Sequence, residues 1–88
     1  MNNFIEYHRD KPIPVDLPND EKIDVFIMDK MVMDDYSKEY YLNILIKDRN
    51  KHNKLTNKMV EHYVYNHIKN YLKLFSIEGD IYVKFNYL

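Results

Sequence analysis

Apolar and polar residues alternate along three stretches of the chain, which is the pattern of strands with one buried face. The clearest alternation covers residues 81–87, and a second covers residues 40–48. Residues 22–33 alternate less regularly and also fit a helix that begins two or three residues earlier. Their β-branched side chains and the polar turn at residues 34–39 favour a strand in a hairpin with residues 40–48. Gly79, the only glycine, lies just before the last strand, where the backbone needs a positive φ.

A fourth stretch carries the spacing of an amphipathic helix. Apolar residues recur every three or four positions up to Phe75, where we expect the helix to end. Thr56 is a good N-cap, and Leu55 before it can pack on Val60; Asn53 is an alternative cap one turn earlier. The predicted apolar face consists of Val60, Tyr63, Val64, Ile68, Tyr71, Leu74 and Phe75.

Residues 1–20 contain all three prolines of the chain. Each proline lacks a backbone N–H and biases the residue before it toward extended geometry, so we expect an extended arm, and its apolar residues suggest that it lies against the domain. We therefore predict a small single α+β domain at residues 21–88, preceded by this Pro-containing N-terminal arm. The domain is expected to be an antiparallel three-stranded ββαβ sheet of order 2-1-3, with one long helix on one face.

The predicted sheet has an apolar outer face. The alternation turns six large side chains away from the helix, including Val32, and a two-layer domain would leave them in water. Three covers are open: the N-terminal arm, a second copy of the chain in a homodimer, or a foreign protein partner. The residues predicted to bind a partner on this face are Phe26, Met28, Tyr41, Leu45 and Tyr82.

Charge is distributed unevenly along the chain, although the formal net charge is only −1. Residues 1–46 sum to −5, residues 47–73 to +5 and residues 74–88 to −1. A basic loop and helix face can meet an acidic partner, or it can simply be a solvated surface. The residues predicted to bind a partner there are Arg49, Lys51, Lys54, Lys58, Lys69 and Lys73.

The sequence contains no catalytic or metal-binding pattern. Cysteine is absent, a single glycine cannot form a phosphate-binding loop, and the two serines fall in predicted turns. His62 and His67 are five positions apart, about 140° around a helix, so they cannot chelate a metal together. The carboxylate pairs at residues 20–21 and 34–35 lie in loops. We expect no enzyme activity, no cofactor and no metal, and the lack of cysteines and of long apolar runs indicates a cytoplasmic protein without a membrane span.

Two functions remain open at this stage. The first is a non-catalytic binding module for a macromolecule, most simply a protein, because tyrosine is abundant and enriched at interfaces. The high content of Asn, Lys, Ile and Tyr, which have A/T-rich codons, fits a phage or mobile-element protein. Such a protein could inhibit a host enzyme or a defence complex such as a CRISPR effector in the host cytoplasm. The alternative is a single-stranded nucleic-acid-binding protein, with the outer-face aromatic residues as a stacking platform beside Lys30, Lys47 and Lys84 and with the basic helix and loop.

Overall fold

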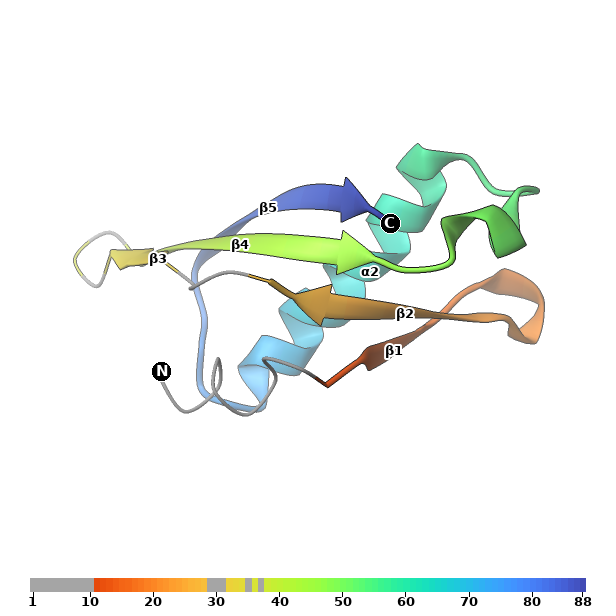
Figure 1. Cartoon of the computed structure of the whole chain (residues 1–88). Coiled ribbons are helices and arrows are strands. Elements are labelled where there is room, and N and C mark those ends of the chain that lie inside the picture. Colours follow the sequence, from red (N-terminus) through yellow and green to blue (C-terminus); the bar gives the residue numbers. More distant parts are fainter. Residues whose placement is uncertain (1–10, 29–31, 35, 37) are drawn as a thin grey trace.

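The computed structural model describes residues 11–28, 32–34, 36 and 38–88, with the backbone alone at residue 19 and residues 32–34. It has two layers, a β-sheet and a helix that crosses one face of it (Figure 1). The predicted class, a small α+β domain with one helix on one face of a sheet, is confirmed. The elements are β1 (Ile13–Asp16), the 3₁₀ helix η1 (Pro18–Asp20), β2 (Lys22–Ile27), β3 (Val32–Asp34), β4 (Glu39–Ile46), the 3₁₀ helix η2 (Arg49–His52), α2 (Asn57–Lys73) and β5 (Asp80–Tyr87).

Strand β4 is the centre of the sheet. Strands β2 and β3 both pair antiparallel with one edge of β4, β2 with its last three residues and β3 with its first three. Strand β5 pairs with the other edge of β4 and runs parallel to it along all eight residues. Strand β1 pairs antiparallel with the free edge of β2. The sheet is therefore mixed and has four strand positions, in the order β1, β2 with β3, β4, β5.

The predicted antiparallel three-stranded sheet of order 2-1-3 is wrong. The chain leaves β4 at one end of the sheet, and α2 carries it back to the other end, so β5 starts where β4 starts (Figure 1). A strand placed beside β4 after such a crossover runs parallel to it. The prediction put the last strand beside β2, but residues 13–16 of the N-terminal arm already occupy that edge.

Part of the expected arm is thus a strand of the sheet. Pro14 is compatible with a strand at this position. The N–H and C=O groups of the odd-numbered residues of β1 face β2, whereas the nitrogen of Pro14, which has no N–H to donate, faces away from β2. Ile13, Val15 and Leu17 are buried beneath α2, at 6% exposure or less. The helical alternative for residues 22–33 is excluded where the structure describes them, since β2 and β3 are strands; residues 29–31 lie outside the described residues.

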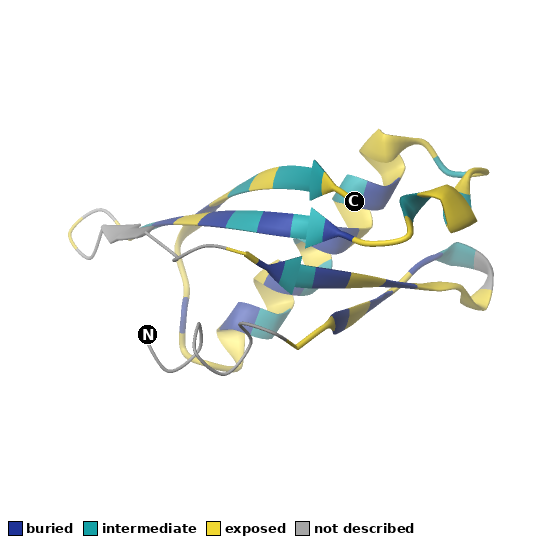
Figure 2. Ribbon diagram, in the orientation of Figure 1, coloured by how far each residue is buried: buried dark blue, intermediate teal, exposed yellow. Residues whose placement is uncertain are grey.

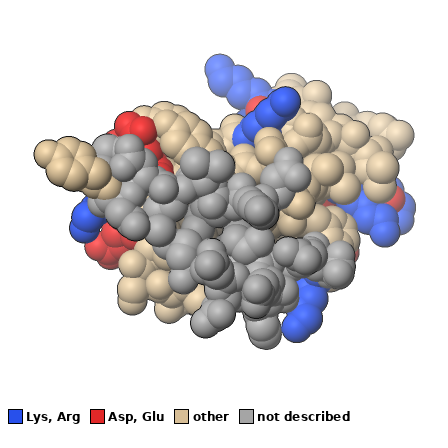
Figure 3. Space-filling model, turned by 60° about the vertical axis from the view of Figure 1, so that its left-hand side comes forward, with Lys and Arg blue, Asp and Glu red and all other residues tan. Residues whose placement is uncertain are grey.

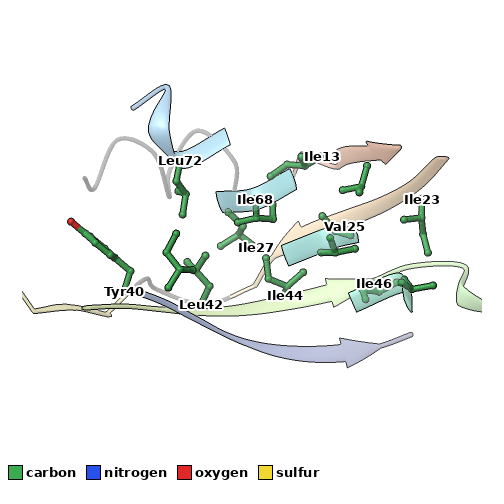
Figure 4. Close-up of a cluster of buried hydrophobic side chains, with 14 of the residues drawn as sticks. Ile13, Ile23, Val25, Ile27, Tyr40, Leu42, Ile44, Ile46, Ile68 and Leu72 are labelled. Atoms are coloured by element: carbon green, nitrogen blue, oxygen red, sulfur yellow. The ribbon is translucent and has the colours of Figure 1, made fainter. Parts of the chain in front are cut away.

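The core lies between the sheet and α2 (Figure 4), and it contains the inward residues that alternation predicts for the strands. Val83 and Phe85 are exceptions, because they are only half-buried. On α2 the fully buried residues are Val60, Val64, Ile68 and Leu72. The predicted apolar face is wrong in including Leu74 and Phe75, which are exposed because the helix ends at Lys73. It also included the exposed Tyr63 and left out the fully buried Leu72.

Two local signals in the sequence, one before α2 and one before β5, agree with the structure. The Thr56 side chain accepts a hydrogen bond from the Met59 backbone N–H at 3.2 Å, which confirms Thr56 as the N-cap. Gly79 has a φ of 153°, and a Cβ there would lie 2.2 Å from the carbonyl oxygen of Lys38. The predicted need for glycine is confirmed, and its cause is the close approach of the chain to the start of β4.

Candidate functional site

The sheet face that points away from α2 carries the five residues predicted to bind a partner there. Alternation sends the buried residues of β2, β4 and β5 toward the helix, so their sequence neighbours point outward. The register pairs Phe26 with Leu45 and Tyr41 with Tyr82. Met28 lies between the two pairs, since its N–H donates to a β4 carbonyl midway between them at 2.9 Å. The structure therefore brings these residues together in one cluster, which we call the outer-face cluster.

Two tyrosines form one end of the outer-face cluster. The rings of Tyr41 and Tyr82 stack with centroids 5.1 Å apart and planes inclined by 17°. The Tyr41 hydroxyl donates to a carboxylate oxygen of Glu39 at 2.8 Å. Tyr41 is still 42% exposed, Tyr82 48% and Met28 50%. The two tyrosine rings are therefore held by local contacts and, like Met28, still reach solvent.

The described part of the N-terminal arm does not cover this face. Ile13, Val15 and Leu17 point to the other side of the sheet, into the core. Residues 1–10 lie outside the described residues, as does the side chain of Val32, which the sequence assigns to the outer face. Of the three predicted covers, the structure therefore removes the portion of the arm from residue 11 onward.

Charged side chains on the outer face nearly cancel. Strand alternation places three lysines and four carboxylates there, counted over the residues whose side chains are described. A surface that binds nucleic acid needs an excess of positive charge to replace the counterions of the phosphates. The balance fits the mixed charge of a protein interface better. The residues are Lys22, Lys47 and Lys84 against Asp16, Asp24, Glu39 and Asp80.

Arg49, the first predicted basic contact, is committed to the fold. Its Nε donates to the side-chain oxygen of Asn57 at 2.7 Å, and one Nη donates to the carbonyl of His52 at 2.7 Å. The other Nη donates to the carbonyl of Leu55. These bonds close the loop between β4 and α2. The guanidinium therefore positions the helix start and has few donors left for a partner.

The other predicted basic residues fall into two groups. Lys51 forms an ion pair of 3.7 Å within the same loop, and Lys54 nearby is exposed. Lys58, Lys69 and Lys73 lie along one flank of α2, about 22 Å from end to end. In the view of Figure 3 the Lys and Arg side chains stand at separate points around the outline and do not form one continuous patch.

Sequence reasoning missed a polar contact between α2 and the end of β5. The Tyr87 hydroxyl donates to the carboxylate of Glu61. Burial, together with this hydrogen bond, raises the pKa of Tyr87 to about 12. Alternation along residues 81–87 placed Tyr87 toward the helix, but residue spacing carries no signal for Glu61 as its partner. The contact fixes the N-terminal half of α2 to the last strand.

The part of the chain that the structure describes contains no group of three or more His, Asp or Glu side chains placed to hold a metal. Within the same residues, no helix is long and apolar enough to cross a membrane. Comparison of the chain with protein-family models, with curated proteins and with solved structures finds no match. The functional argument therefore rests on the geometry of the surfaces.

Proposed function

We propose that the protein is a non-catalytic binding module that docks a protein partner on the outer face of its sheet. The observation that carries this proposal is the outer-face cluster, in which Met28, Tyr41 and Tyr82 stay 42–50% exposed on adjacent strands. Soluble monomers seldom leave contiguous apolar patches of this kind in water. Tyrosine supplies a large rigid contact area with a polar tip, and methionine adapts to the shape of a partner.

Charge supports a protein partner over a nucleic acid. The outer face carries balanced charge, and its aromatic residues lack the surplus of lysines that would hold a phosphate backbone. Lys58, Lys69 and Lys73 lie on the helix layer, on the other side of the sheet from the stacked tyrosines. A single strand of nucleic acid could not stack on the tyrosines and contact these lysines over a short path.

The composition favours one specific role for this docking, which is inhibition of a host enzyme or of a defence complex such as a CRISPR effector. Its support is the high content of Asn, Lys, Ile and Tyr, which fits a phage or mobile-element gene. Docking through the outer face does not depend on this step, so the experiment addresses docking first.

The test compares Met28→Asp and Tyr82→Asp with the control Met59→Asp. Met59 is a methionine of similar exposure, 43%, on α2 in the other layer. Tagged protein is cross-linked in nuclease-treated cell lysate, and the bound proteins are quantified. We expect a partner that survives the nuclease, is kept by Met59→Asp and is lost with both outer-face variants. Loss of the partner on nuclease treatment, or equal capture by all variants, would overturn the proposal.

Self-association provides the second arm of this test. If sedimentation shows a dimer of the purified protein that Met28→Asp breaks and Met59→Asp does not, the outer face binds a second copy. That outcome would replace the foreign partner as its occupant.

A further inference from the structure

The two edges of the sheet are built differently. Strand β1 is short and carries Pro14 at an outward-pointing position, which removes an N–H from that edge. Proline and short length are devices that stop an edge strand from pairing with another chain. Strand β5 has eight residues and no proline, and it pairs with β4 residue for residue without a bulge. Within the described residues, no strand pairs with the outer edge of β5.

Alternate residues of β5 present their backbone groups to that open edge. The N–H of Asp80 donates to the carbonyl of Lys38 at 3.0 Å, and the N–H of Leu88 donates to the carbonyl of Ile46 at 3.1 Å. The even-numbered residues therefore face β4, and the odd-numbered residues face outward. The first outward carbonyl, at residue 81, accepts a hydrogen bond from the hydroxyl of residue 65 at 3.2 Å. Within the part of the chain that the structure describes, no strand pairs with the outward N–H and C=O groups of Val83, Phe85 and Tyr87, which an added strand could bind.

The side chains along β5 are also incompletely covered. Val83 and Phe85 point toward α2 but are only half-buried, and Tyr87 is 38% exposed. Ile13 and Val15, the equivalent inward residues at the opposite edge, are buried. Figure 2 shows the difference, since β5 is teal and yellow along most of its length where β2 and β4 carry dark blue. An added strand would complete this side of the core as β1 completes the other.

The flank of α2 next to this edge is basic. Lys69 and Lys73 line an open depression of about 290 Å³ together with Ile81, the second residue of β5. Lys58 is eleven positions before Lys69, close to three full helical turns, so it lies on the same flank. Two carboxylates oppose these lysines: Glu78 lines the same depression, and Glu61 accepts a hydrogen bond from the Tyr87 hydroxyl near the other end of β5. A strand that pairs with β5 would therefore run beside three lysines and two carboxylates, a surplus of one positive charge.

We propose that the open edge of β5 accepts an extended acidic segment of a partner protein as an additional antiparallel or parallel strand. Backbone hydrogen bonds to Val83, Phe85 and Tyr87 would hold the segment, and its carboxylates would meet Lys58, Lys69 and Lys73. A second copy of the chain is the less favourable occupant, since antiparallel pairing of two β5 strands about a twofold axis perpendicular to the sheet would put both helices on the same face and bring the two basic flanks against each other. This edge is a different surface from the outer-face cluster, so the inference does not depend on the proposed function.

The test uses two peptides of about ten residues, long enough to span a strand of this length. One alternates Glu with Thr, and the other alternates Lys with Thr. Amide hydrogen exchange is followed by NMR on the full chain. In the free protein, we expect fast exchange at Val83 and Phe85 and slow exchange at Tyr82 and Lys84. The Glu peptide should slow exchange at the outward pair by about tenfold at saturation and leave the inward pair unchanged.

Two pairs of variants separate backbone pairing from charge. Val83→Pro removes an outward N–H, and Val83→Ala makes a similar loss of side chain but keeps that N–H, so only the proline variant should abolish binding. Lys69→Glu with Lys73→Glu should weaken binding of the Glu peptide by at least about tenfold. The control Lys22→Glu with Lys51→Glu makes the same charge change at a different depression of the surface and should alter binding by less than about twofold.

Three results would overturn the inference. The first is failure of the Glu peptide to bind at about 1 mM, and the second is equal binding of the two peptides. The third is protection of Val83 and Phe85 in the free protein that increases with protein concentration, because a second copy would then be the occupant. The folded state of each variant is checked beforehand by the dispersion of its amide signals.

Discussion

Replacing Gly79 with alanine tests the parallel pairing of β5 with β4. The new Cβ would lie 2.2 Å from the Lys38 carbonyl oxygen and 2.7 Å from the Tyr40 ring, far inside the 3.4 Å of ordinary contact. A φ of 153° is also one that side-chain-bearing residues rarely adopt, and such strain costs about 1–3 kcal/mol. Relief of the clash would pull apart the bond from the Asp80 N–H to Lys38, worth about 1 kcal/mol. We expect the free energy of unfolding to fall by about 2–4 kcal/mol.

Urea unfolding followed by circular dichroism measures this loss. With a slope of about 1–1.5 kcal/mol per molar urea, the midpoint should fall by roughly 1.3–4 M. Ser76→Ala is the control. Residue 76 is exposed and lies in the same segment between α2 and β5, and its positive φ strains serine and alanine equally. The control should change stability by less than about 0.5 kcal/mol. A loss below about 1 kcal/mol for Gly79→Ala would mean that Gly79 does not lie against β4. The open edge of β5 would then have no structural basis.

Three further predictions address the helix and its contacts. Glu61→Gln should lower the pKa of Tyr87 from about 12 toward 10.0, as measured by phenolate absorbance. Because the pKa of Tyr87 is higher in the folded state, its contribution to stability is complete below pH 10 and is lost as the pH rises through 12. The Glu61→Gln variant should therefore lose less stability than the unchanged protein between pH 10 and pH 12. Leu72→Ala should lower the free energy of unfolding in urea by about 2–5 kcal/mol, because residue 72 is fully buried. Leu74→Ala should lower it by less than about 0.5 kcal/mol, because residue 74 is exposed. Equal losses would mean that α2 does not end at Lys73. Ser76→Gly should stabilise the protein by about 0.5–1 kcal/mol, because the φ of 61° at residue 76 suits glycine, and an unchanged melting midpoint would contradict this.

The elements of the fold were predictable because each is encoded by local spacing. Alternation located β4 and β5, and it located β2 and β3 as one predicted strand at residues 22–33. The Thr56 cap located the start of α2 to the residue. The end of α2 was placed two residues too late, since Leu74 and Phe75 continue the apolar spacing beyond Lys73. Local spacing cannot decide that, because helix and turn residues can share the same periodicity at a terminus.

The pairing of the strands was not predictable in the same way. The three prolines led to the prediction of an extended arm, although Ile13, Val15 and Leu17 alternate as in a strand. Pro14 fits an edge strand, because its nitrogen points outward. Strand pairing is a contact between residues distant in the sequence, and a single sequence carries no direct record of it. The parallel direction of β5 does follow from the helical crossover once its neighbour is known.

The two predicted binding surfaces differ in the same way: one follows from local spacing, and the other depends on contacts that spacing does not show. Which side chains share the outer face depends only on alternation, and the structure places Phe26, Met28, Tyr41, Leu45 and Tyr82 there as expected. The basic group was defined by charge along the chain, which says nothing of existing partners. Hydrogen bonds to two loop carbonyls and to the Asn57 side chain at the start of α2 make the Arg49 guanidinium a structural element, and no charge count reveals them.

The position of the short strand β1 explains both the wrong strand order and the two proposed binding surfaces. In the predicted order, β2 would stand between the strands of Tyr41 and Tyr82, and their rings could not stack. Because β1 takes the free edge of β2, β5 lies beside β4, and the two rings come to 5.1 Å. The same placement makes β5 the last strand of the sheet, with its outward backbone groups next to Lys69 and Lys73. Changes at Pro14 that weaken the pairing of β1 should therefore affect the sheet edges without altering the register of β4 with β5, since the two pairings share no hydrogen bonds.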